Sequence, residues 1–407
     1  MTGTLPQQTL HVVGAGMAGL ACAVAAARGG WRVALHEAAP QAGGRCRSFR
    51  CDRLDRMIDN GTHLMLGANR HALAFATAIG GHETLEAVAP LFPFLDLASG
   101  RQWVLSPGKL TSGVWETVAA MGLPWVPAGQ SVAGRLGGKR SFAALWQPLC
   151  EAMLNTQAED ASAKLFGCVL RELLMGGKTA MRPFIAQGGL SAAFAAPAIA
   201  TLGSYGAQVN FRRRLVAVGD RSLEFDDGTI ALGPHDRVVL ALPPWAASEL
   251  LPGLPPMPTR AIVNAHYRLN HPAELPGGQR FLGLIGGMAQ WLFVRDDVAS
   301  VTISAADRLL DMSTDDLAAT LWRDVAALLG ADPARLPPCR VIKERRATLA
   351  HTPEVVENRP GPATKIPFLW LAGDWMASPW PCTIEAAIAS GLTAARLAIG
   401  RDDLSFA

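Results

Sequence analysis

Three glycines near the start of the chain have the spacing of a ligand-binding turn. Gly14, Gly16 and Gly19 form a G-x-G-x-x-G pattern, and Met17 and Ala18 stand between the last two. The first glycine permits a tight turn, the second lets the backbone approach a pyrophosphate, and the third lets a helix pack close to a strand. The pattern therefore predicts that this turn binds a dinucleotide.

Two strands and a helix must position this turn. The apolar run at residues 10–13 predicts a buried parallel strand, and the alanine-rich residues 20–28 predict a helix whose first amides point at the glycines. A second strand at residues 32–36 ends at Glu37, which follows Gly14 by 23 residues. A carboxylate at this position typically binds a ribose hydroxyl, so the spacing favours a dinucleotide over a purely structural turn.

A second glycine pair favours FAD over NAD. Gly43 and Gly44 let the chain turn beneath a pyrophosphate, and Arg45 can neutralise the phosphates through charge-assisted hydrogen bonds. A polar loop with a solvated arginine is the alternative. The three residues resemble the second half of the FAD fingerprint of the amine oxidase and phytoene desaturase superfamily of flavoproteins.

The C-terminal part supplies a second set of candidate cofactor residues. Gly373 and Asp374 follow an expected strand at residues 368–372, and doubly wound sheets bind ligands at the carboxyl ends of their strands. Thr383 and Ile384 begin an expected helix, whose positive end could stabilise negative charge on a reduced flavin. We expect Asp374 to accept a hydrogen bond from a ribityl hydroxyl. An ordinary strand and capped helix are the alternative.

His63, Asp59 and Trp380 are candidates for catalysis. Asp59, Gly61 and His63 have the D-x-G-x-H spacing that returns to the cofactor in flavoproteins of this superfamily, and a packed core histidine is the alternative for His63. Trp380 is a candidate ring beside the flavin. The resemblance also implies that the backbone near Val216 meets the adenine.

The composition limits the classes of function. Half of the residues are apolar, and the net charge is only +3. No run of like charges marks a nucleic-acid-binding arm. The seven cysteines form no C-x-x-C pair, which favours free thiols in a reducing cytoplasm and argues against a zinc site. We therefore expect no metal, no nucleic acid and, because no uncharged window suits a spanning helix, no transmembrane segment.

One block of sequence narrows the family. Residues 145–150, 154–156 and 161–166 read LWQPLC, LNT and ASAKLF, and they resemble the signature of the hydroxysqualene dehydroxylases, the squalene-associated flavoproteins of hopanoid synthesis. Similar words occur at residues 44–49, 58–63 and 371–375, so the resemblance covers essentially the whole chain.

The resemblance implies a reaction and a location. The reaction is reductive removal of the hydroxyl of hydroxysqualene, giving squalene, with hydride from N5 of reduced FAD. A proton donor, a water-poor pocket and aromatic faces would serve this chemistry. We expect a cytoplasmic protein, with peripheral contact to the inner face of the cytoplasmic membrane and to prenyl synthases of the squalene pathway. The segment 114–132, rich in Trp, Pro and Gly, is the candidate lipid contact, and a lid or core packing is its alternative.

We predict an α/β fold in which a Rossmann-like FAD-binding domain of the glutathione-reductase type accompanies a second, mixed sheet-and-helix substrate domain. The expected FAD-binding domain is discontinuous and comprises residues 1–70, 190–245 and 341–407. The expected substrate domain comprises residues 71–189 and 246–340.

Three other functions compete with this prediction. An amine oxidase would move hydride in the opposite direction, but such enzymes often frame the flavin with tyrosines, and Tyr205 and Tyr267 are the only two here. A carotenoid or phytoene-type desaturase is closer to the predicted function than an amine oxidase and is harder to exclude. A catalytically silent flavoprotein that holds prenyl synthases together is the non-enzymatic alternative.

Overall fold

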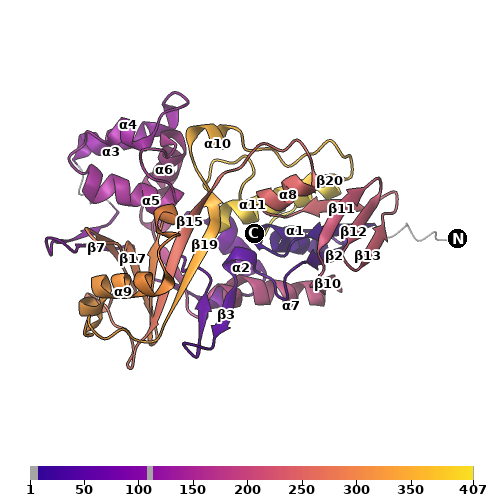
Figure 1. Ribbon diagram of the computed structural model, residues 1–407. Helices are drawn as coiled ribbons and strands as arrows, with labels where there is room; N and C mark the ends of the chain where they lie inside the picture. Colours follow the sequence, from indigo (N-terminus) through magenta and orange to yellow (C-terminus); the bar gives the residue numbers. More distant parts are fainter. Residues whose placement is uncertain (1–7, 108–112, 407) are drawn as a thin grey trace.

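The computed structural model describes residues 8–107 and 113–406. Figure 1 shows a first lobe on the right, around α1 and β2, and a second lobe on the left that carries α3 to α6 above a large sheet. The predicted α/β class is confirmed.

A five-stranded parallel sheet forms the core of the first lobe. Its order is β10-β2-β1-β14-β20, so the first strand of the chain lies in the middle. These strands are β10 (Gln208–Phe211), β2 (Arg32–Glu37), β1 (Thr9–Val13), β14 (Arg237–Leu240) and β20 (Leu369–Leu371). Segments from both ends of the chain therefore build one sheet.

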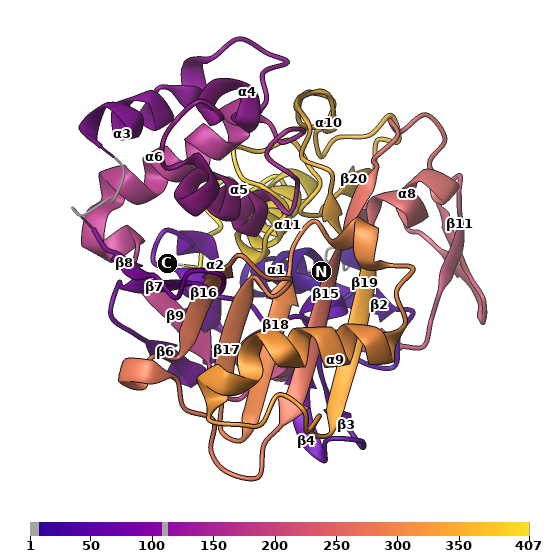
Figure 2. The same ribbon diagram turned by 60° about the vertical axis from the view of Figure 1, so that its left-hand side comes forward.

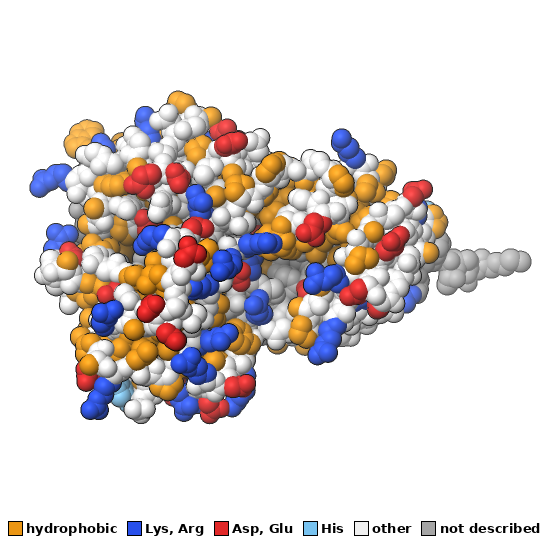
Figure 3. Space-filling view, viewed as in Figure 1, with side chains coloured by type: hydrophobic (Ala, Val, Ile, Leu, Met, Phe, Trp, Pro, Cys, Tyr) orange, Lys and Arg blue, Asp and Glu red, His pale blue; other side chains and the backbone are white. Residues whose placement is uncertain are grey.

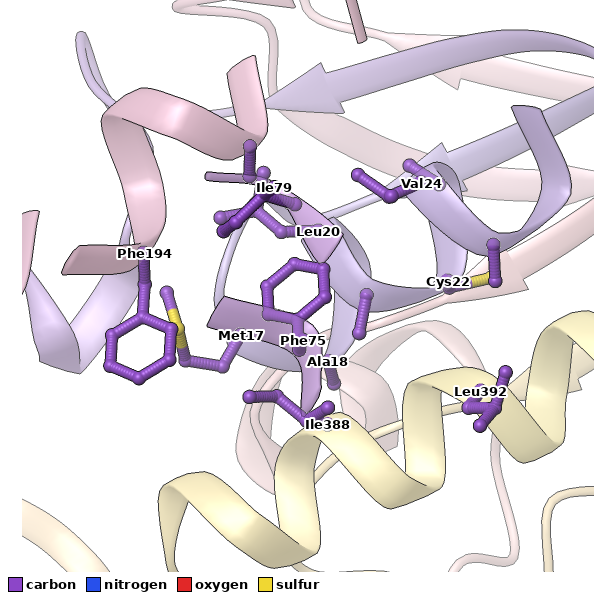
Figure 4. Close-up of a cluster of buried hydrophobic side chains, with 14 of the residues drawn as sticks. Met17, Ala18, Leu20, Cys22, Val24, Phe75, Ile79, Phe194, Ile388 and Leu392 are labelled. Atoms are coloured by element: carbon purple, nitrogen blue, oxygen red, sulfur yellow. The ribbon is translucent and has the colours of Figure 1, made fainter. Parts of the chain in front are cut away.

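Two helices from opposite ends of the chain pack against each other beside this sheet. They are α1 (Met17–Arg28) and α11 (Ile384–Ile399). A Cβ on Gly391 of α11 would lie 2.1 Å from the carbonyl oxygen of Ala18, so only glycine allows this approach. Figure 4 shows Leu20, Phe75 and Ile388 in the buried cluster around α1, whose residues 17–27 are all buried.

A seven-stranded sheet forms the second lobe, in the order β19-β15-β18-β17-β16-β7-β8. Neighbours pair antiparallel except β16 and β7. The strands are β19 (Cys339–Leu349), β15 (Thr259–Arg268), β18 (Val298–Ile303), β17 (Trp291–Arg295), β16 (Phe281–Ile285), β7 (Phe92–Asp96) and β8 (Gln102–Leu105). Helix α9 (Thr314–Val325) crosses one face of this sheet, where Trp322 packs on Tyr267 (Figure 2).

A group of helices covers the end of this sheet at β7 and β8. Its members are α3 (Val114–Met121), α4 (Val132–Leu136), α5 (Gln147–Leu154) and α6 (Ala163–Ala180). Trp146, Leu154 and Phe166 of the family-like block are fully buried in the core of this group. None of residues 145–166 is among the residues lining the two cavities described below. The block that resembles the family signature therefore forms the core of this group of helices and does not line a cavity.

Shorter strands and helices complete the fold. The remaining strands are β3 (Ser48–Cys51), β4 (Arg56–Asp59), β5 (Met65–Leu66), β6 (Leu85–Ala87), β9 (Pro183–Ala186), β11 (Leu215–Gly219), β12 (Ser222–Phe225) and β13 (Gly228–Ala231). The remaining α-helices are α2 (Arg70–Ala78), α7 (Ala196–Ser204), α8 (Pro244–Leu250) and α10 (Pro353–Glu357).

Strand β19 bears on the proposed division into domains. The strand pairs with β15 over most of its length, so it belongs to the seven-stranded sheet. A boundary at residue 341 would cut this strand. We propose the same two discontinuous domains, with the last boundary moved to about residue 350.

A buried histidine makes the stability of the fold depend on pH. The Nδ1 of His351 donates to the Leu154 carbonyl (2.6 Å), and its Nε2 accepts from the Cys382 amide (2.9 Å), so the ring is held neutral. Burial lowers the pKa of His351 to about 4. The unfolded chain protonates this histidine near pH 6.5, and the folded chain only near pH 4. We therefore expect the free energy of unfolding to decrease as the pH is lowered from about 6.5 to about 4. Urea unfolding measured between pH 7.5 and 4.5 should show that the free energy of unfolding depends less steeply on pH in His351→Gln than in wild type. An equal dependence on pH in the two proteins would contradict this assignment.

Candidate functional site

A cavity of about 660 Å³ lies where the carboxyl edge of the parallel sheet meets β15 and β19. The predicted cofactor residues that line it are Gly14, Gly16, Met17, Ala18, Glu37, Gly43, Gly44, Arg45, Val216, Gly373, Asp374, Thr383 and Ile384. Gly19 is the one predicted cofactor residue outside this lining. Residues from both ends of the chain thus meet around one cavity, as the sequence predicts.

The glycine turn has the backbone geometry that its spacing predicts. Gly14 has a φ of +103°, which disfavours any other residue. A Cβ on Gly19 would lie 1.8 Å from the carbonyl oxygen of Gly14, which explains its position behind the cavity wall. A Cβ on Gly16, in contrast, would meet no protein atom within 4 Å. The turn therefore leaves space at Gly16 for a ligand.

Glu37 is held at the end of β2 by two backbone amides. Its Oε2 accepts from the amide of Ala15 (2.7 Å), and its Oε1 accepts from the amide of Ala39 (2.7 Å). The first of these bonds ties the carboxylate directly to the glycine turn. The side chain is thereby fixed in the cavity wall, which supports the proposed role at the ribose.

Arg45 and Asp374, which lie 329 positions apart, form an ion pair in the cavity wall. Arg45 donates to Oδ1 of Asp374 (2.7 Å) and to the carbonyl oxygen of Ala347 (2.5 Å). Burial would lower the pKa of Arg45, but the charge and hydrogen bond of Asp374 outweigh it and raise that pKa. The guanidinium thus stays charged, and this contact joins the two distant halves of the site.

The N-terminus of α11 faces the same cavity. Thr383 is its N-cap, and the hydroxyl oxygen accepts from the amide of Ala386 (3.3 Å). Ile384 and Ala387 also line the cavity. The partial positive charge at the start of this 16-residue helix can stabilise negative charge on a ligand.

His63 stands in the cavity wall beside the glycine turns. Its Nδ1 donates to the carbonyl of Gly61 (2.7 Å), which leaves Nε2 available to a ligand or to water. The surrounding protein lowers the pKa of His63 by burial, and the Gly61 carbonyl acts in the opposite direction. The side chain is exposed on the cavity side, so the ring is accessible to a ligand there.

The other two catalytic candidates do not line this cavity. The carboxylate of Asp59 accepts from Ser48 Oγ (2.6 Å), from the amide of Leu190 (2.9 Å) and from Arg295 (3.0 Å), so its oxygens are occupied by structural partners. The indole of Trp380 donates to Glu172 (3.1 Å) of α6. The structure therefore does not support direct contact of either side chain with the flavin.

Sequence reasoning missed the contribution of β19 to the cavity. This strand supplies Glu344, Arg346, Ala347 and Thr348 to the lining, and Arg346 stacks over Trp245 at 4.8 Å. The sequence pattern of a buried strand is weak here because the strand carries five Lys, Arg or Glu residues between its ends. Such a sequence is atypical of a buried strand.

The lining fits FAD. The space at Gly16 admits a diphosphate, the carboxylate of Glu37 suits a ribose, and the start of α11 suits the electron-rich edge of a flavin ring. Arg45 supplies a fixed positive charge between the two ends of the site. These groups come from the carboxyl edge of a doubly wound sheet, where such nucleotides bind.

Comparisons with known proteins agree with this geometry. Residues 129–399 match the family model for flavin-containing amine oxidoreductases, and residues 12–79 match that for NAD(P)-binding Rossmann-like domains. The chain is 41% identical to a hydroxysqualene dehydroxylase of Rhodopseudomonas palustris and 39% identical to one of Sinorhizobium fredii. Each alignment covers 96% of this chain and 98% of the relative.

Solved structures show the same fold. Putrescine oxidase bound to putrescine superposes with a TM-score of 0.72 at 16% identity, covering 97% of this chain and 99% of that chain. Cyclohexylamine oxidase from Brevibacterium oxydans gives the same TM-score, identity and coverage. These matches confirm the predicted fold, and the match to the flavin-containing family confirms the predicted cofactor, FAD. The chain therefore belongs to the flavin-containing amine oxidoreductase family and, within it, to the hydroxysqualene dehydroxylases.

Proposed function

We propose that the protein reductively removes the hydroxyl of hydroxysqualene and releases squalene. The observation that carries this proposal is the 36–41% identity, over 96% of the chain, to three proteins named hydroxysqualene dehydroxylase. The alternatives of amine oxidase, carotenoid desaturase and flavin-holding scaffold have no comparable support.

The cavity offers what this chemistry needs. Bound reduced FAD supplies hydride, and the chain supplies the surroundings. We propose that the start of α11 stabilises negative charge at the flavin and that His63 hands a proton to the departing oxygen. Leu242, Trp245 and Ile262 give the lining an apolar part suited to an isoprenoid.

The first experiment tests turnover. We expect photoreduced enzyme, mixed anaerobically with hydroxysqualene, to form squalene while the flavin absorbance at 450 nm returns. His63→Gln should keep its flavin and lose at least about tenfold in the reoxidation rate, because proton transfer by a side chain typically contributes 10²–10⁴-fold. Turnover of a polyamine or phytoene with no conversion of hydroxysqualene would contradict the proposal.

We further propose that one face of the group of helices α3 to α6 binds an anionic membrane surface. Among the described residues, no helix combines the length and apolarity needed to cross a bilayer. Trp115 and Trp125, however, are 84% and 71% exposed, and Val118 and Met175 lie exposed with them on α3 and α6. Arg171 stacks over Trp125 at 5.5 Å, so positive charge accompanies the apolar side chains. Figure 3 shows hydrophobic and basic side chains interspersed over this part of the molecule, at the upper left.

The lipid contact has its own test. We expect wild-type protein to bind vesicles that contain phosphatidylglycerol and to release them at high salt, since the attraction is partly electrostatic. Trp115→Ser with Trp125→Ser should weaken binding by about tenfold or more, because each exposed ring would otherwise be buried in lipid. Tyr205→Ser, at an exposed site 52% accessible on the nucleotide-binding lobe, is the matched control. Equal vesicle binding by wild type, the double tryptophan variant and Tyr205→Ser would show that this face is not the lipid contact.

The predicted contact with prenyl synthases stays a prediction.

A further inference from the structure

A second, smaller chamber adjoins the main cavity, and His63 lines both. Its volume is about 30 Å³. A chamber of this size can hold roughly two water molecules, at about 10–15 Å³ each. The polar or charged side chains around it are Asp59, Thr62, His63, His266, Arg280, Arg295 and Ser300. Arg280 is exposed, so the chamber leads from His63 toward the surface.

His266 is the unusual member of this group. Its side chain is only 1% exposed, and its Nδ1 is hydrogen-bonded with Ser300 Oγ (2.8 Å). Its Nε2, although fully buried, makes no hydrogen bond of normal geometry within the part of the chain described. Buried polar groups are nearly always satisfied by protein or ordered water, because an unsatisfied one is destabilising. A water in the chamber is the natural partner for this nitrogen.

The charges around the chamber balance one another. Asp59 pairs with Arg295 at 3.0 Å, so neither imposes an uncompensated charge on His266. Burial lowers the pKa of His266 to about 4; the charge and the backbone carbonyl of Asp59 raise it, and Arg295 lowers it. His63 faces Asp59 and Arg45, which likewise act in opposite directions. At neutral pH both rings are therefore neutral imidazoles. The Nε2 of His63, whose Nδ1 proton is held by the Gly61 carbonyl, can accept a proton and pass that same proton on.

The proposed reaction explains why such a chamber is useful. The carbon–oxygen bond breaks, the carbon gains hydride from reduced flavin, and the oxygen leaves as water after taking one proton. Each turnover therefore consumes a proton from the protein, whereas free water in the main cavity would capture the developing cation. A separate route for protons satisfies both requirements.

We propose that the small chamber holds ordered water bound to Nε2 of His266, and that this water returns protons from the surface to His63. The proposal rests on the proposed function for its use of the proton. His266 is then a positioning residue, because it holds the water and does not touch the substrate.

The kinetic test compares variants across pH. His266→Phe removes the water-binding nitrogen and fills its space, so at pH 8.5 we expect flavin reoxidation by hydroxysqualene to slow by about tenfold, with a larger solvent isotope effect. At pH 6, where protons are plentiful, the rate should approach that of wild type. Flavin content and the affinity for hydroxysqualene should not change. His266→Gln, which keeps a polar group for the water, should recover part of the rate.

Two further variants complete the comparison. His11→Gln replaces a buried histidine outside both cavities and should leave the pH profile unchanged. Ser300→Ala removes the partner of Nδ1 and should give a weaker form of the same defect, which decides the matter if the phenylalanine variant does not fold. A wild-type pH profile and isotope effect in both His266→Phe and Ser300→Ala would overturn the proposal.

A crystal structure provides a readout that does not depend on turnover. At high resolution the oxidised holoenzyme should show water within hydrogen-bond distance of Nε2 of His266, and a dry chamber would overturn the inference. Holoenzyme that fails to convert hydroxysqualene would instead contradict the proposed function, while the electron density still decides whether the chamber is hydrated.

Discussion

Arg45→Ala should strip FAD from the protein and destabilise it by about 2 kcal/mol, because it removes the partner of a buried aspartate. Asp374, whose side chain is 8% exposed, would keep its charge and lose the guanidinium that balances it. The variant would also lose the positive charge available to the FAD diphosphate. Flavin absorbance of the purified protein and urea unfolding of the apoprotein measure the two effects separately.

Arg56→Ala is the matched control for this variant. Arg56 also pairs with an aspartate at 2.7 Å, Asp297, but it lies outside the lining of both cavities. Its side chain is about as exposed as that of Arg45. Asp297 is more exposed than Asp374 (18% against 8%), so we expect a smaller loss, of at most about 1 kcal/mol, and a normal flavin content. Full flavin content in Arg45→Ala would contradict the assignment of Arg45 to the cofactor site.

Two alanine substitutions in the glycine turn should fail in different ways. Gly19→Ala would place a Cβ 1.8 Å from a backbone oxygen, so the turn must move, and we expect a loss of about 3 kcal/mol or more in stability together with loss of FAD. Gly16→Ala meets no protein atom, so the apoprotein should melt within a few degrees of wild type. The added methyl group points into the space for the diphosphate and should still abolish flavin binding.

Calorimetry of the apoproteins and flavin titration separate these outcomes. Tight flavin binding by Gly16→Ala would show that the diphosphate does not approach this glycine. A stable Gly19→Ala apoprotein would show that the turn relaxes more easily than its packing indicates. The contrast between the two variants distinguishes a role in packing from a role in binding.

Local patterns predicted the parts of the site that depend on short stretches of chain. The strand, glycine turn and helix around Gly16, and the N-cap at Thr383, follow from spacing within about ten residues. The ion pair between Arg45 and Asp374 joins two residues that were each predicted, but their contact depends on how two lobes close together. No periodicity in the sequence contains that information.

The features that local patterns did not indicate have equally specific physical causes. Trp380 lies near Asp374 in sequence, yet the intervening loop directs its indole to Glu172 of another helix. The strand β19 carries many charged residues because it is at the edge of the sheet and partly exposed, so its composition hides its pairing. His266 lies within β15, and only the packing of neighbouring strands reveals its unsatisfied nitrogen.

The order of the strands in the parallel sheet has a consequence for biosynthesis. The central strand β1 leaves the ribosome first, but its sheet is completed by β20, and α1 is covered by α11, which ends at Ile399. A nascent chain therefore cannot enclose the flavin until β20 and α11 have both been synthesised. Cofactor loading must follow the synthesis of these two elements, and until then the apolar faces of β14 and α1 are exposed to aggregation.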